Sequence, residues 1–197
     1  METSDYLVLG AGSGGLGSAR RAASHGAKVA VVAGGAIGGT CVNAGCVPKK
    51  IMWNAAECAE WLADASDYGF EVEAPRVDWA QLKRARDAYI QRLNAIYARN
   101  VELDGIELVS GRARFTTASS VQVGERQLGA KAILIATGGR PSVPSVPGAE
   151  LGLTSDDFFE LTARPERVAI AGAGYIAVEL AGVLSALGSD VTLFLRG

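Results

Sequence analysis

Two of the chain's three cysteines, Cys41 and Cys46, stand five positions apart in the stretch GGTCVNAGCVPKK. Side chains five apart on a regular α-helix project about 140° from each other, so an undistorted helix keeps two such thiols apart. A disulfide needs Cα atoms within about 7 Å, and Gly45 supplies backbone freedom for the required distortion. The spacing therefore makes this pair a candidate for redox chemistry or metal binding.

The composition limits the classes of partner. The chain has 197 residues, 49% of them hydrophobic, and its net charge of −2 comes without a basic block, which argues against nucleic acid as a partner. Apolar stretches such as VTLFL and AILIA are far too short to cross a bilayer. The N-terminus also lacks the apolar core of a signal peptide. We therefore expect a cytoplasmic protein that has no membrane partner.

Cysteine usage favours redox chemistry over a structural or metal role. Cytoplasmic thiol systems keep structural disulfides reduced, so a close pair there is more often catalytic or metal-binding. Three cysteines and one histidine, His25, make a poor zinc set. We expect no bound metal, and a metal-binding Cys41–Cys46 pair stays the alternative. Cys58 belongs to no motif and is expected to be a small buried residue.

Glycine-rich turns occur twice, each between a strand-like and a helix-like run. The residues are Gly10, Gly12 and Gly15 in the first motif and Gly172, Gly174 and Ala177 in the second. In the GxGxxG/A pattern the first glycine makes the turn, the second lets the backbone approach a pyrophosphate, and the third allows close packing. The helix N-terminus then faces the phosphates. Two such motifs in βαβ frames predict two dinucleotide sites.

In neither motif is the ribose-binding position occupied by the Asp or Glu that usually stands there. Ala33 occupies that position after the first motif, so the ribose there must rely on backbone groups or bind more weakly. After the second motif the strand ends in Arg196. A guanidinium suits a 2′-phosphate, which favours NADP(H) over NAD(H).

Hydrophobic periodicity orders the remaining elements. Two βαβ units, at the N-terminus and from residue 167 onward, enclose a helical region and three strand-like runs expected to form an antiparallel meander. The long helix is expected over residues 78–102, with an apolar stripe of Leu82, Tyr89, Leu93 and Ile96. The proline-rich stretch RPSVPSVPGAE is expected to be a linker.

Several segments together resemble the flavin-dependent pyridine nucleotide–disulfide oxidoreductase family: GGTCVNAGCVPKK, GSGGLGSARRAA, RLNAIY, ILIATGGRP, PGAELGLTSDDFF and GAGYIAVELAGVLSALGS. The resemblance implies an α/β fold: a Rossmann-like FAD-binding domain with a helical insertion and a β-meander, at residues 1–141. The start of a second Rossmann-like domain, for NADPH, would follow at residues 142–197. A C-terminal domain that makes the family's homodimers would be absent.

The resemblance also implies roles for individual residues. Cys41 and Cys46 would form the redox disulfide, with Cys41 attacking the substrate and Cys46 contacting the flavin. Lys49 would lie beside the flavin, paired with Glu179, and Tyr175 would cover the nicotinamide pocket. Further expected contacts to FAD are Gly10, Gly12, Ser13, Gly14, Gly15, Thr40, Ala113, Ala136, Thr137 and Gly138. Those to NADPH are Gly172, Gly174, Ile176 and Arg196.

Within the family, SARR and RLNAIY resemble the branch that reduces glutathione disulfide. Ser13, Arg20 and Tyr97 match its substrate contacts, and a guanidinium suits a carboxylate. Gly17 stands where trypanothione reductases carry an acid, and Pro-Lys-Lys differs from the Pro-Ser-Lys of dihydrolipoamide dehydrogenases and mercuric reductases. Large thioredoxin reductases share Pro-Lys-Lys and stay an alternative.

A second hypothesis treats the chain as a flavin-binding module without turnover. The family's proton donor is a histidine near the C-terminus, and His25, in ASHGAK, does not match its motif. We therefore expect these 197 residues alone to be inactive.

Overall fold

The structure is a computed structural model that describes residues 2–73 and 76–195. The chain divides into two compact units. Unit 1 comprises residues 1–45 and 90–140, and unit 2 comprises residues 46–89 and 141–197. The division of the chain into an FAD domain at 1–141 and a partial NADPH domain at 142–197 stays a prediction.

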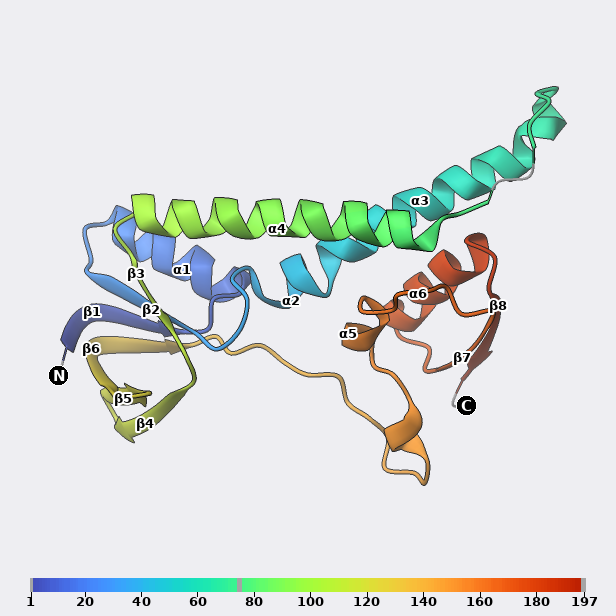
Figure 1. Cartoon of the computed structure of the whole chain (residues 1–197). Coiled ribbons are helices and arrows are strands. Elements are labelled where there is room, and N and C mark those ends of the chain that lie inside the picture. The colour runs from blue at the N-terminus through green and yellow to red at the C-terminus, as the bar shows by residue number, and fades with distance from the viewer. Residues whose placement is uncertain (1, 74–75, 196–197) are drawn as a thin grey trace. The chain divides into compact units, whose positions relative to one another are not determined.

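Unit 1 is built on a six-stranded sheet with the strand order β3-β2-β1-β6-β5-β4 (Figure 1). The strands are β1 (Glu2–Leu9), β2 (Val29–Ala33), β3 (Glu107–Ser110), β4 (Ala113–Thr117), β5 (Ser120–Val123) and β6 (Arg126–Ile135). β1 pairs in parallel with β2 and β6, and β2 with β3, whereas β4, β5 and β6 pair antiparallel. The predicted Rossmann-like sheet with a meander is confirmed, although β3 belongs to the parallel part.

Both faces of this sheet are covered, which explains why β1 and β2 are apolar along their length. On one face, Val8 and Val31 pack with α1 (Ser13–Ser24) and with Val101 near the end of α4 (Trp79–Leu103). On the other face, Leu7 packs with residues of the meander such as Val121, and both side chains are fully buried. Burying one such side chain stabilises the fold by about 1.5–3 kcal/mol.

The first glycine turn lies where the order of strands in the sheet reverses. β1 lies between β2 on one side and β6 on the other, and the chain leaves its carboxyl end through Gly10 into α1. In open parallel sheets, ligands bind outside the carboxyl ends of strands at such a switch point. The fold therefore positions the first motif where a dinucleotide site is expected.

Unit 2 contains most of the helices and a second, smaller sheet. Its elements are α3 (Cys46–Asp64), η1 (Ala65–Tyr68), the first part of α4, η2 (Ala149–Leu151), α5 (Ser155–Phe158), β7 (Arg167–Ala171), α6 (Tyr175–Ala186) and β8 (Asp190–Phe194). β7 and β8 pair in parallel, with α6 between them in sequence, so the second predicted βαβ unit is confirmed. The expected linker, at residues 140–150, contains no strand and is exposed except at Ala149, where η2 begins.

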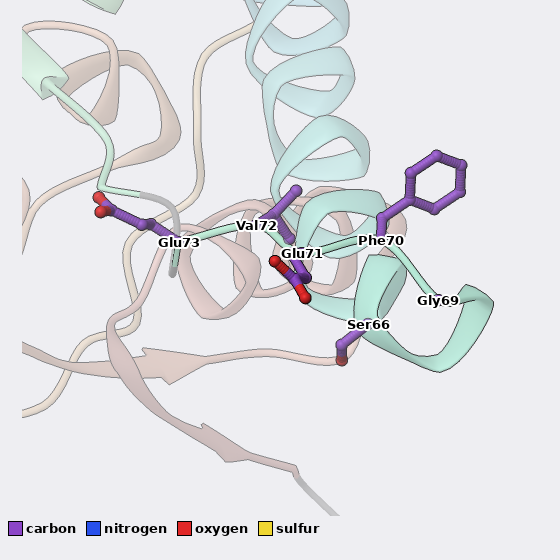
Figure 2. A pocket seen from close by; sticks show the side chains of 6 residues that line it. All are labelled: Ser66, Gly69, Phe70, Glu71, Val72 and Glu73. Carbon is purple, nitrogen blue, oxygen red and sulfur yellow. The ribbon is translucent and has the colours of Figure 1, made fainter.

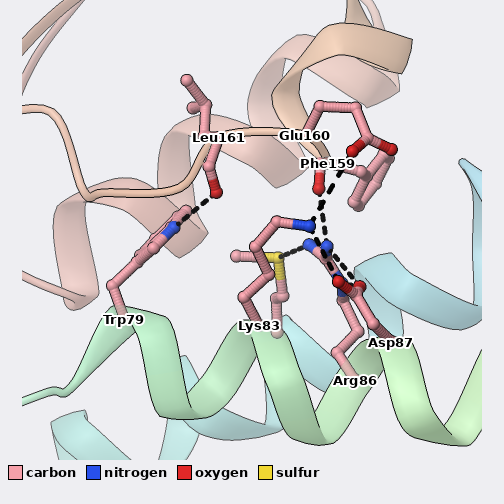
Figure 3. A network of polar contacts seen from close by, with 8 residues as sticks. Trp79, Lys83, Arg86, Asp87, Phe159, Glu160 and Leu161 are labelled. Carbon is pink, nitrogen blue, oxygen red and sulfur yellow. Dashed lines mark hydrogen bonds and ion pairs between the residues drawn. The ribbon is translucent and has the colours of Figure 1, made fainter.

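A polar network around Arg86 ties the segment after α5 to α4 (Figure 3). Arg86 is only 2% exposed, and its guanidinium donates hydrogen bonds to the Phe159 carbonyl at 2.5 Å and to the Asp87 carboxylate at 2.7 Å. The Trp79 indole donates to the Leu161 carbonyl at 2.9 Å. The network therefore satisfies a buried cation and two backbone carbonyls together.

Two expectations about side-chain burial are wrong. Tyr89 and Ile96, expected in the apolar stripe of the long helix, are 46% and 41% exposed, while Trp79, Arg86 and Val101 are buried instead. The stripe assumed one buried face along the whole helix, whereas the two ends of α4 belong to different units. Cys58, expected to be buried, is exposed on α3.

Candidate active site

Backbone packing explains the glycines of the first turn. Gly10 has φ +121°, and a Cβ there would lie 2.2 Å from the Ala136 carbonyl oxygen. A Cβ on Gly15 would lie 1.9 Å from the Gly10 carbonyl oxygen. Any side chain at either position would therefore push β1, α1 and the end of β6 apart.

The start of α1 fits an anionic group. Gly12 is the N-cap residue, and the described residues provide no side-chain cap and no acid in the first turn. Ser13 and Gly14, at the first two helical positions, are exposed. Backbone N–H groups at a helix start lack intrahelical acceptors and attract phosphate. This turn is therefore suited to a dinucleotide pyrophosphate such as that of FAD.

The cysteine segment meets this turn through α2 (Gly39–Asn43), although 27 positions separate Gly12 from Gly39. The Gly38 N–H donates a hydrogen bond to the Ala11 carbonyl at 2.8 Å, and Gly12 and Gly38 form a β-bridge. A Cβ on Gly39 would lie 2.7 Å from the Gly12 Cα. Exposed Thr40 and half-buried Cys41 therefore lie beside the glycine turn.

The helix is interrupted between the two cysteines, as their spacing predicted. α2 ends at Asn43, and α3 begins at Cys46, whose side chain is exposed. A Cβ on Gly45 would lie 2.8 Å from the Thr40 carbonyl oxygen, so the tight turn requires glycine. Because Cys41 and Cys46 belong to different units, their disulfide stays a prediction.

The ends of β2 and β6 border the same turn. The Ala136 N–H donates to the Leu9 carbonyl at 2.8 Å, and exposed Thr137 and Gly138 follow it. At the end of β2, Ala33 is 8% exposed, and it accepts a hydrogen bond from the Gly111 N–H at 2.9 Å.

Ala113, two residues after Gly111, begins β4 and is half-buried. Ala113, the expected contact to the adenine, therefore lies close to the end of β2, where Ala33 takes the place of the acid that usually binds the ribose.

The second glycine turn has the same form in unit 2. Gly172 has φ +136°, and Gly174 is the N-cap of α6. The Ala177 Cβ lies 3.9 Å from a Cβ built on Gly172, so this turn accommodates alanine at its third position. Tyr175 and Ile176 are 77% and 42% exposed. Arg196, expected to bind a 2′-phosphate, lies outside the described residues.

Lys49 and Glu179, which are 130 positions apart, meet in unit 2. The Lys49 ammonium donates a hydrogen bond to the Glu179 carboxylate at 2.7 Å, and the two side chains are 25% and 33% exposed. The pair connects α3 to α6, where the ring of Trp53 also lies 3.5 Å from a Cβ built on Gly182. The predicted contact is present, and its role beside a flavin stays a prediction.

The three expected substrate residues lie in unit 1. Ser13 and Arg20 are seven positions apart on α1 and so share a helix face. Tyr97 of α4 is half-buried against the core. Arg20 forms an ion pair with Asp104, just after α4, which raises the pKa of the guanidinium. No motif pointed to Asp104, since the pairing depends on how α1 and α4 pack.

A surface hollow is lined by none of these residues. It has a volume of about 580 Å³ and is lined by Ser66, Gly69, Phe70, Glu71, Val72 and Glu73 (Figure 2). One short stretch of chain forms it, and Phe70 is 66% exposed. This hollow brings together no distant groups and is not a candidate site.

A sequence profile described as pyridine nucleotide-disulphide oxidoreductase matches residues 4–197. The chain belongs to this family. That match confirms the resemblance inferred from the glycine and cysteine motifs. Among the described residues, no helix is long and apolar enough to cross a membrane.

Two curated relatives are similar along nearly the whole chain. A glutathione reductase of Schizosaccharomyces pombe is 57% identical over 201 residues, covering 98% of this chain and 43% of that protein. A glutathione reductase of Yarrowia lipolytica is 51% identical over 207 residues, covering 98% of this chain and 44% of that protein. The chain therefore spans less than half the length of these relatives.

Proposed function

We propose that the chain forms part of an NADPH-dependent flavoenzyme that reduces glutathione disulfide to two glutathione molecules. The observation that carries the proposal is the packing of α2, with Cys41, against the Gly10–Gly15 turn. That packing would put a reactive thiol beside a bound dinucleotide. The similarity to glutathione reductases supports the choice of substrate.

The cysteine chemistry balances as two thiol–disulfide exchanges. The Cys41 thiolate attacks one sulfur of glutathione disulfide, which forms a mixed disulfide and releases one glutathione thiolate. The Cys46 thiolate then attacks Cys41 of the mixed disulfide and releases the second. The cycle leaves Cys41 and Cys46 oxidised, and NADPH supplies the two electrons that reduce them again.

FAD would supply two-electron transfer between the nicotinamide and the cysteine pair. The residues that would hold it are those of the first glycine turn, Thr40, Lys49, Ala113 and Ala136–Gly138. Lys49, held by Glu179 at 2.7 Å, would present a positive charge to the ring system. Gly172, Gly174, Tyr175, Ile176 and Arg196 would hold NADPH.

Substrate selection would rest on unit 1. Arg20 and Ser13, on one face of α1, would bind a glutathione carboxylate together with Tyr97. Because Asp104 already pairs with Arg20, binding would require the guanidinium to share its hydrogen bonds. In the longer protein we expect a homodimer, as the family resemblance implies, and a cytoplasmic location.

An anaerobic titration tests the electron path. The chain, purified with FAD, is titrated with NADPH and separately with NADH while the flavin spectrum is followed. We expect a yellow protein that NADPH reduces in preference to NADH, with a long-wavelength charge-transfer band. The Cys46→Ser variant, as matched control, should keep the flavin and lose that band.

Other outcomes would contradict the proposal. A colourless protein with a metal bound to Cys41 and Cys46 would favour the metal-binding alternative. A longer protein that reduces thioredoxin and leaves glutathione disulfide unchanged would place the enzyme in a different branch of the family.

A further inference from the structure

Asn43, in the stretch between the two cysteines, uses its amide to close the loop that leads into α2. Its Nδ2 donates hydrogen bonds to the Ile37 carbonyl at 3.0 Å and to the Gly39 carbonyl at 2.9 Å. Gly39 begins the helix that carries Cys41. The Asn43 side chain therefore braces the turn that sets the direction of this helix.

Asn94, on α4, connects this brace to the body of unit 1. Its Nδ2 donates a hydrogen bond to the Asn43 Oδ1 at 3.0 Å. The orientation of both amides follows from their partners, because Asn43 must direct its N–H₂ group to two carbonyls and so offers only its oxygen to Asn94. The chain of hydrogen bonds thus runs from α4 through Asn43 to the start of α2.

The Asn94 Oδ1 is buried and has no hydrogen-bond partner among the described residues. Burying an acceptor without a partner destabilises the fold by more than one neutral hydrogen bond stabilises it. An apolar side chain of similar shape avoids that cost. Stability alone therefore does not favour asparagine at this position. Violations of this kind are expected where a side chain serves function.

We propose that Asn94 is a positioning residue for Cys41. It donates to Asn43 and thereby holds α2 closed against the glycine turn, which limits the access of reagents to the Cys41 thiol and sets its geometry for exchange. The redox role of Cys41 in this inference rests on the proposed function. The hydrogen-bonded clamp formed by Asn94 and Asn43 stands on the contacts alone.

The test measures thiol reactivity in the reduced chain. Wild type and Asn94→Leu are alkylated with iodoacetamide, and the rates at Cys41, Cys46 and Cys58 are followed by peptide mass spectrometry. We expect alkylation of Cys41 to be about two- to tenfold faster in the variant, the effect of losing one hydrogen bond. The rate at Cys58, exposed on α3, should stay unchanged, and the urea midpoint should stay the same or rise.

Asn100→Leu is the matched control, because Asn100 is also half-buried on α4 and has no side-chain hydrogen bond recorded among the described residues. It should leave the Cys41 rate unchanged. In an Asn43→Ala background, Asn94→Leu should add nothing further, since Asn94 acts through Asn43. Equal acceleration by Asn100→Leu, additive effects in the double variant, or an unchanged Cys41 rate would overturn the proposal.

A second readout separates this inference from the proposed function. The Cys41–Cys46 pair is equilibrated in glutathione redox buffers, and the oxidised fraction is measured. A shifted midpoint in Asn94→Leu, with Asn100→Leu like wild type, supports the clamp. If wild type forms no disulfide at all, the proposed function fails, whereas the alkylation rates still decide whether the clamp exists.

Discussion

At the residue scale, close backbone approach decides which glycines are required. Gly15 and Gly17 both lie on α1, yet a Cβ on Gly15 would lie 1.9 Å from a backbone oxygen, whereas one on Gly17 would meet nothing within 4 Å. The two positions differ only in what lies opposite them. They therefore form a matched pair for measuring the cost of opening the turn.

We expect Gly15→Ala to lower the free energy of unfolding by about 1–3 kcal/mol, as overpacking does. Gly17→Ala should raise it by about 0.5–1 kcal/mol, because alanine favours the helix and restricts the unfolded chain. Urea denaturation followed by circular dichroism measures both. Equal effects from the two variants would show that the close approach to Gly10 is absent.

Recognition of the first motif needed only the sequence, because its glycines are local to one turn. The departure at Ala33 was equally visible. The pairing of Arg20 with Asp104 was not, because these residues lie 84 positions apart and no motif joins them. The family resemblance suggested that Arg20 binds a glutathione carboxylate, and it did not indicate that Arg20 pairs with Asp104.

At the element scale, Arg86 shows how tertiary packing overrides a helix pattern. A charged residue at this position on α4 would be expected to be exposed. The Arg86 guanidinium is instead buried, and it donates hydrogen bonds to the Phe159 carbonyl and the Asp87 carboxylate. A helical period identifies one continuous apolar face and does not reveal where a cation will find buried acceptors.

Replacing Arg86 should be costly. Arg86→Met leaves the Phe159 carbonyl without its donor and Asp87 without one of its cations, and we expect a loss of about 3–5 kcal/mol in the free energy of unfolding. Arg84→Met, on the exposed side of the same helix, should change it by less than about 0.5 kcal/mol. Hydrogen exchange at residues 158–161 should increase only in the Arg86 variant.

The same network predicts an acid-sensitive contribution to stability. Partial burial tends to raise the pKa of Asp87, and the hydrogen bonds from Lys83 and Arg86 outweigh it, so the folded-state pKa lies below its usual value of 3.8. A lowered pKa stabilises the fold above the unfolded-state value and ceases to do so as the pH falls through the folded-state value.

Asp87→Asn should therefore destabilise the chain at pH 7 and flatten the loss of stability below about pH 4. Urea midpoints measured from pH 7 down to pH 3 provide the comparison. Asp67→Asn serves as the control, because Asp67 is an exposed residue of η1. If the urea midpoint fell equally steeply with decreasing pH in wild type and in the Asp87 variant, the assignment to Asp87 would be contradicted.

At the scale of the whole molecule, the chain holds two glycine turns and the Cys41–Cys46 motif, and it covers 43–44% of the relatives' lengths. Its single histidine, His25, is the exposed C-cap residue of α1. General acid catalysis at a leaving thiolate needs a positioned proton donor. In this chain, the proposed reduction of the flavin by NADPH can therefore be measured apart from the full cycle that reduces glutathione disulfide.

We expect these 197 residues to show no sustained oxidation of NADPH with glutathione disulfide, even where NADPH reduces the bound flavin. The measurement follows NADPH absorbance and thiol release together under multiple-turnover conditions. Release of two thiols per NADPH over many cycles would show that the chain alone is a complete enzyme.

The sequence by itself determined the family, the two βαβ units, the glycine turns and the break between the cysteines, because each depends on local spacing and backbone preference. The family resemblance predicted that Lys49 pairs with Glu179, and the structure contains that contact. Only the tertiary structure decided that Arg20 pairs with Asp104 and that Asn94 contacts Asn43, which braces the start of α2. These contacts join residues far apart in the chain, and such contacts follow from how whole elements pack rather than from any local pattern.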